Sequence, residues 1–172
     1  MVVAHLLNML CGYSLNAFGL QPRSIHGLLG IVLSPFLHGS VGHLVSNAFP
    51  FAVLSALILT DGVGRYVAVS TVVVVIGGLL VWSFGRDANH IGASGWVFGL
   101  WAYLIAQAFY SRSFKRLFIA LLVLSLYGGM IFGLLPRHGV SFESHLFGAL
   151  AGWFAAWLMR PRADSEAGRA HL

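Results

Sequence analysis

Long apolar stretches separated by short polar breaks fill almost the whole chain. A transmembrane helix needs about 20 mostly apolar residues to cross roughly 30 Å of hydrocarbon. The pattern predicts six such helices, at residues 2–17, 36–60, 66–84, 93–110, 117–135 and 144–159, the first of them interrupted by Asn8 and Gly12. The run of β-branched residues at 71–76 would favour a strand in water. In lipid the backbone must form its hydrogen bonds within its own segment, so we expect a helix there too.

The polar breaks and the chain ends complete this organisation. The segment 19–35 is partly apolar and contains Pro22 and Pro35, which predicts a loop lying at the membrane interface. The first apolar stretch follows Met1 without a basic segment or an Ala-x-Ala-like site, so a cleaved signal peptide is not expected. We predict one membrane domain at residues 1–160. Residues 161–172 are polar and are predicted to form a disordered cytoplasmic tail.

Composition agrees with an integral membrane protein. Of the 172 residues, 58% are hydrophobic and only 9% are charged, whereas soluble domains carry about 25% charged residues. The pI near 10 would suggest nucleic-acid binding in a soluble protein. Here the basic residues flank apolar stretches, so we expect contact with the bilayer and none with nucleic acid. A single cysteine, Cys11, excludes an internal disulfide and any Cys-x-x-Cys motif.

The distribution of basic residues predicts the orientation. Lys and Arg are enriched on the cytoplasmic side of membrane proteins. Seven lie on one side of the predicted bundle, in the loops and tail that contain Arg65, Arg112, Lys115, Arg116, Arg160, Arg162 and Arg169. Three lie on the other side, at Arg23, Arg86 and Arg137. Both termini are therefore predicted to be cytoplasmic, and the starts of helices 93–110 and 144–159 to lie at the outer side.

Several polar side chains interrupt the apolar stretches, and such residues suggest a functional site by default. His43 and Asn47 are four residues apart and share one helix face, while His38 precedes them by about one turn. Ser94 and His145 both fall in the first turn of a predicted helix.

Small residues are expected to bring those two first turns together. Gly95 and Gly99 are four residues apart, as are Gly148 and Gly152, and glycines at this spacing allow membrane helices to approach closely. Such a contact would place Ser94 beside His145.

These side chains suggest acyl-transfer chemistry. A serine hydroxyl is a weak nucleophile until a base takes its proton, and His145 can be that base and later protonate the leaving amine. His43, Asn47 and the backbone N–H of Ser94 can stabilise the oxyanion. Glu143, two residues from His145, is expected to point elsewhere on the helix. A Ser–His dyad is therefore the simplest interpretation.

Each feature taken alone also has a purely structural explanation. A Gly-Ala-Ser-Gly sequence in a membrane helix is more often a packing motif, and His43 with Asn47 can simply join two helices. His26, His90 and His138 fit interfacial positions, so they receive no catalytic role. A zinc enzyme would be expected to carry a motif such as His-Glu-x-x-His, which the predicted helices lack. We expect neither a metal nor a cofactor.

Taken together, the motifs resemble the rhomboid family of intramembrane serine proteases. The resemblance rests on "SPFLHGSVGHLVSN", on "GASGWVFGL" and on a histidine followed by Gly-x-x-x-Gly, and it covers residues from about 16 to 158. It implies the six-helix form found in bacteria and hence an inner-membrane location. It also implies Ser94 as nucleophile and His145 as base, with His43 and Asn47 stabilising the oxyanion. The implied supporting residues are His38, Gly92, Gly95, Phe98, Gly148 and Gly152, with Phe98 stacking on His145.

The resemblance also implies a substrate class. Family members cleave single-span membrane proteins near the outer face, between small residues. One departure is that Leu29-Gly30 stands where many members have Trp-Arg, which affects how the first outer loop is anchored. The alternative function is a catalytically inactive relative that binds client membrane helices. Such a protein would be expected to lack the nucleophile or the base, and this chain has both. The pattern does not specify an oligomeric state.

Overall fold

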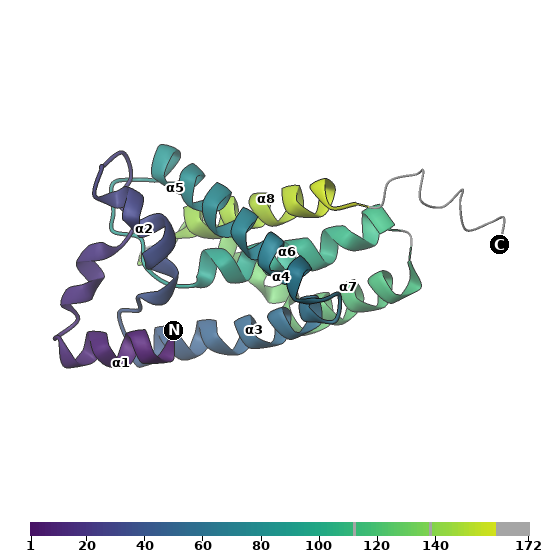
Figure 1. Cartoon of the computed structure of the whole chain (residues 1–172), viewed down its shortest axis with the longest axis horizontal. Helices are drawn as coiled ribbons and strands as arrows, with labels where there is room; N and C mark the ends of the chain where they lie inside the picture. Colours follow the sequence, from purple (N-terminus) through teal and green to yellow (C-terminus); the bar gives the residue numbers. More distant parts are fainter. Residues whose placement is uncertain (112, 138, 161–172) are drawn as a thin grey trace.

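The computed structural model describes residues 1–111, 113–137 and 139–160, and within these ranges the chain is all-α (Figure 1). The predicted tail at 161–172 lies outside the described residues. The longer helices are α1 (Val2–Leu10), α2 (Gly27–Leu33), α3 (Val41–Leu59), α4 (Val63–Val72), α5 (Gly78–Phe84), α6 (Ser94–Ser111), α7 (Phe114–Tyr127) and α8 (Phe142–Leu158). Short 3₁₀ or π segments are η1 (Ser14–Phe18), η2 (Ser34–Phe36), η3 (Val73–Gly77) and η4 (Gly128–Leu134).

Helix α6 lies at the centre of the bundle. It packs most extensively against α8 and also contacts α7, α3 and η3, and Figure 1 shows it between α3 and α8. Most of its residues are buried, including Tyr103, which is fully enclosed, and Trp101. A helix that is apolar on all sides is expected to be buried on all sides. The aromatic residues of this segment therefore serve mainly to pack the core.

The β-branched segment is helical, as the membrane argument predicts. Helices α4 and α5 join through η3, a π-helical stretch, into one helix over Val63–Phe84. This segment packs closely against both central helices. A Cβ atom on Gly99 would lie 2.2 Å from a Val73 methyl group, and one on Gly77 would lie 3.4 Å from the Gly148 Cα.

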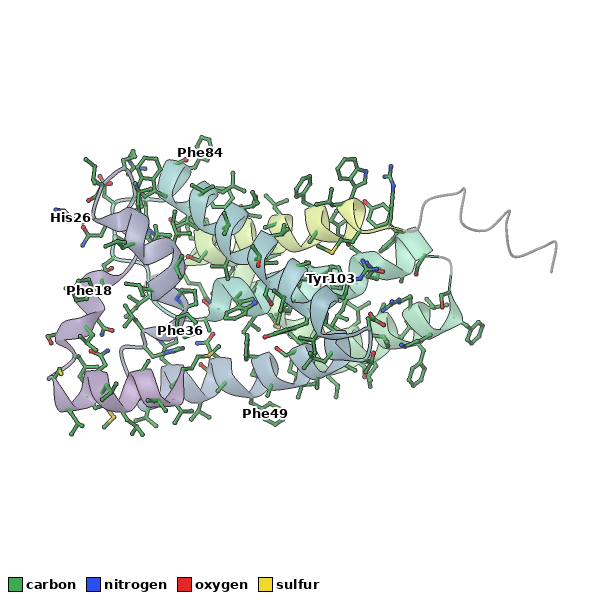
Figure 2. The ribbon with its side chains drawn as sticks, in the orientation of Figure 1. Phe18, His26, Phe36, Phe49, Phe84 and Tyr103 are labelled. Atoms are coloured by element: carbon green, nitrogen blue, oxygen red, sulfur yellow. The ribbon has the colours of Figure 1, made fainter. Side chains whose placement is uncertain are left out.

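The surface is apolar, as a lipid environment requires. Within the described ranges, three helices are long and apolar enough to cross a membrane, at Val41–Leu59, Val63–Phe84 and Phe114–Leu134. Figure 2 shows Phe49 and Phe84 pointing away from the bundle, and they are 68% and 71% exposed. The chain is thus an integral membrane protein with a helical bundle.

The first apolar stretch is broken at Gly12, one of its two predicted interruptions, and does not continue as a helix to residue 17. Helix α1 has nine residues, which span only about 14 Å. It ends because Gly12 and Tyr13 adopt left-handed conformations, with φ of 60° and 63°, and the chain then turns into η1. The second predicted helix also starts later than expected. Ser40 caps α3 by accepting a hydrogen bond from the His43 N–H, so His38 lies in the connection before α3.

The segment 19–35 is held against α5 by hydrogen bonds to the side chain and to the backbone of Trp82. The Trp82 indole donates to the Ser24 carbonyl at 2.8 Å, and the Arg23 N–H donates to the Trp82 carbonyl at 2.9 Å. A Cβ on Gly30 would lie 2.4 Å from the Leu20 backbone. Glycine at position 30 therefore allows α2 to pack closely on the start of the same loop. This contact explains why Gly30 stands where many family members have Arg.

Candidate functional site

Glycines hold α6 and α8 together close to their first turns. A Cβ on Gly148 would lie 2.0 Å from the Gly95 carbonyl oxygen, and one on Gly152 would lie 1.9 Å from the Gly99 carbonyl oxygen. Real Cβ atoms do not approach backbone oxygens this closely, so only glycine fits at positions 148 and 152. The small-residue contact predicted between these two helices is present in the structure.

A cavity of about 820 Å³ opens beside these first turns. Its lining includes Ser94, Phe98, His145, His43 and Asn47, contributed by α6, α8 and α3. The structure thus gathers around one cavity the side chains that the sequence suggested for nucleophile, base, stacking partner and oxyanion donors. Further lining comes from the connections before α6 and α8, at Arg86, His90 and Ser141 among others.

His145 is held in a defined orientation from two sides. Its Nδ1 lies 2.7 Å from the Gly133 carbonyl oxygen. A carbonyl only accepts hydrogen bonds, so Nδ1 carries a proton, and in the neutral imidazole Nε2 then has the lone pair. The ring also stacks on Phe98 with centroids 4.2 Å apart and planes 5° from parallel. His145 therefore has the tautomer that a general base at Nε2 requires.

His43 and Asn47 share a face of α3 at the same cavity. The Asn47 amide donates one hydrogen to the His43 carbonyl at 2.8 Å. A primary amide has two N–H donors, so this bond orients the amide and leaves its second hydrogen for another acceptor. Gly92 has φ of 111°, and a Cβ there would lie 2.5 Å from the His43 ring. Glycine is therefore required at position 92 for both its backbone conformation and its contact with His43.

His38 links the connection before α3 to the start of α6. Its Nε2 accepts a hydrogen bond from the Ala93 N–H at 3.4 Å, and its ring meets the His43 ring edge-on at 5.0 Å. Burial, and secondarily the neighbouring His43, lower the pKa of His38 to about 4. His38 is therefore neutral near pH 7, as acceptance at Nε2 requires.

His5 was missed by the sequence reasoning. It is 1% exposed, and its ring lies edge-on to His38 with centroids 6.3 Å apart. An ionisable residue inside an apolar stretch was the signal that marks it. In the described ranges no group of three or more His, Cys, Asp or Glu side chains is arranged to hold a metal ion.

A second set of missed residues joins the two connections above the cavity. Arg86 pairs with Glu143, with Nε 3.3 Å from a carboxylate oxygen, and Glu143 is only 6% exposed. The His90 ring bonds the Ser141 hydroxyl. His90 is buried, with 3% of its surface exposed. His26 is exposed, and His138 lies outside the described residues.

Comparison with known proteins agrees with this arrangement. The model of the Rhomboid domain family matches residues 26–162. An uncharacterized protein of Mycobacterium tuberculosis and one of Mycobacterium bovis are each 35% identical over 167 residues, which cover 91% of this chain and 70% of the relative. One of Mycobacterium leprae is 34% identical over 181 residues, covering 96% of this chain and 72% of the relative. No solved structure matches. The chain belongs to the rhomboid family.

Proposed function

We propose that this protein is an intramembrane serine endopeptidase that hydrolyses a peptide bond in single-span membrane proteins. Rhomboid proteins are generally serine proteases of the membrane. One observation carries the proposal for this chain. The base candidate His145 has its Nδ1 proton bonded to a carbonyl and its ring stacked on Phe98, and it lines the same cavity as Ser94.

The proposed reaction uses two side chains for proton transfer. Nε2 of His145 takes the proton from the Ser94 hydroxyl as the oxygen attacks the substrate carbonyl. The protonated imidazole then donates to the leaving amine, and a water molecule hydrolyses the acyl-enzyme by the reverse sequence. In this scheme no carboxylate among the described residues bonds His145. The Gly133 carbonyl takes that position, bonded to the same ring nitrogen that an aspartate bonds in a triad.

Oxyanion stabilisation is assigned to three donors. His43 and Asn47 line the cavity from α3, and Asn47 has a second amide hydrogen that its bond to the His43 carbonyl does not use. The Ser94 N–H belongs to the first turn of α6, where the helix provides no acceptor for it. Removing one such donor typically lowers turnover about 100- to 1000-fold.

The location of charges supports the proposed membrane orientation. Asp61, just after α3, pairs with Lys115 and Arg116, and Arg65 bonds the Met159 carbonyl. Of the α3 residues that line the cavity, Pro50 lies nearest this basic end, and the nine residues from it to the end of α3 at Leu59 span about 14 Å. We therefore place the basic end in the cytoplasm and the cavity at the outer face. A six-span topology with both termini cytoplasmic in a bacterial inner membrane completes the proposal.

The alternative function is a client-binding protein without proteolytic activity. It would need the cavity and the helical surface but not the Nδ1-protonated form of His145. The two functions differ in what Ser94→Ala changes. In a protease this substitution abolishes turnover. In a binder without proteolytic activity it has no turnover to abolish, and client binding stays intact.

The test is cleavage of a single-span reporter by the purified protein in liposomes. Wild type should cleave, and Ser94→Ala and His145→Ala should each abolish cleavage. Ser111→Ala is the matched control, because Ser111 ends the same helix and its hydroxyl bonds the Gln107 carbonyl. It should cleave like wild type. Cleavage by Ser94→Ala at the wild-type rate would overturn the proposal, and cleavage stopped by EDTA would favour a metal enzyme.

A further inference from the structure

An ion pair that the proposed mechanism does not use joins the first turn of α8 to the connection before α6. Glu143 lies in this turn, two residues before His145. Its carboxylate is 8% exposed and pairs with Arg86 from the connection between α5 and α6. Burying a carboxylate is costly unless it is paired, so this ion pair fixes where the turn can sit.

Three further contacts join the same two connections. Arg86 also donates to the Val140 carbonyl, and its guanidinium lies 5.6 Å from the centre of the Phe142 ring. The His90 ring bonds the Ser141 hydroxyl, which in turn bonds the Ser144 hydroxyl at 2.6 Å. The segment 85–90 therefore holds the start of α8 at several points, and Arg86, His90 and Ser141 line the same cavity as His145.

We propose that Arg86 and Glu143 are positioning residues that set the place of His145 relative to Ser94. The inference rests on the proposed function. The glycine contacts at Gly148 and Gly152 fix how far apart these helices lie beyond the first turn of α8, and within that turn Gly95 packs against Ser144. The Arg86–Glu143 pair ties that turn to the connection that leads directly into Ser94. Glu143 does not line the cavity, so its effect on the reaction must pass through His145.

The first test is kinetic. Glu143→Gln keeps the side chain's shape and removes its charge, and we expect kcat to fall about 10- to 100-fold with KM nearly unchanged, since small displacements of a catalytic group cost this much. Arg86→Gln should give a similar loss. The double variant should be no worse than either single one, because the pair acts as a unit. Arg86→Lys, which keeps the charge, should recover most of the rate.

The matched control is Asp87→Asn. Asp87 is the neighbouring residue on the same connection, but it pairs with Arg23 and is largely exposed. Its loss should leave kcat unchanged. A loss confined to KM in Arg86→Gln and absent from Glu143→Gln would overturn the inference, since Arg86 would then contact substrate instead of positioning His145.

The second test needs no activity. In the Ser94→Ala background, hydrogen exchange of backbone amides at 142–147 should be faster with Glu143→Gln and unchanged with Asp87→Asn. Unchanged exchange, or faster exchange with a wild-type kcat in the Ser94-containing variant, would overturn the positioning role. If wild type itself cleaves nothing, the proposed function fails, and the exchange result still decides whether this pair holds the turn.

Discussion

Replacing Gly148 by alanine tests the contact that brings α6 and α8 together. The new Cβ would lie 2.0 Å from the Gly95 carbonyl oxygen and 2.8 Å from its carbon, both backbone atoms that cannot rotate away. Contacts below 3.0 Å do not occur at real Cβ atoms, so the helices must separate locally by at least about 1 Å. Gly148 is one turn after His145, so the displacement reaches the proposed base directly.

The expected cost has a kinetic and a thermodynamic part. A misplacement of about 1 Å in an active site can lower turnover about 100-fold, and overpacking a core typically costs about 1–3 kcal/mol. Gly148→Ala should therefore cut the reporter cleavage rate about 100-fold and lower the midpoint of thermal unfolding in detergent. Gly95→Ala should be milder, because its Cβ would meet the Ser144 carbonyl at 3.0 Å.

The control for this series is Gly64→Ala. Gly64 lies in α4, and a Cβ there meets nothing within 4 Å. Alanine at an open helical position should be neutral or slightly stabilising. Gly148→Ala with wild-type cleavage and stability would refute the argument that close packing of these helices sets the site, as would equal losses in Gly148→Ala and Gly64→Ala.

Two further predictions concern the histidine environments. Phe98→Leu removes the ring stacked on His145 and should lower kcat about tenfold, which corresponds roughly to the free energy of an aromatic pair. Phe109→Leu, on the exposed side of the same helix, should leave kcat unchanged. Equal rates for the two variants would contradict the stacking role. The pKa of His38 falls from 6.5 to about 4 in the folded protein. Between these two pH values the unfolded chain therefore binds a proton at His38 that the folded protein does not bind. Stability should therefore be fully present above about pH 6.5 and fall by up to about 3 kcal/mol as the pH drops to about 4. His38→Gln should flatten this part of the pH profile of thermal unfolding, and an unchanged slope would show that His38 does not cause it.

The sequence predicts the central part of the fold well because its signals are local. Glycine spacing in α6 and α8 predicts their close contact, and the membrane's demand for internal hydrogen bonds predicts a helix through the β-branched run. The break in the first apolar stretch at Gly12 was predictable, since glycine readily adopts a left-handed conformation, but the second left-handed residue there is Tyr13. Tyrosine rarely adopts that conformation, so its presence gave no turn signal.

The site was only partly predictable for a related reason. Residue types indicate Ser94 and His145, but the group that orients His145 is the Gly133 carbonyl. Every residue has a carbonyl, so no pattern of side chains marks this one. The Arg86–Glu143 pair joins residues far apart in the chain, and one sequence alone does not show which charges meet. His5 carried a visible signal, since it is an ionisable residue in an apolar stretch, but its partner His38 became evident only from the fold.

The most direct test of the central claim is covalent labelling of Ser94. A fluorophosphonate reacts with a serine only when a base activates it. The purified wild-type protein in detergent should gain one adduct by intact mass, mapped to Ser94 by peptide sequencing, and His145→Ala should suppress the adduct while Ser111→Ala should not. An unlabelled wild-type protein, or an adduct that persists in His145→Ala at the wild-type rate, would contradict a Ser94–His145 dyad.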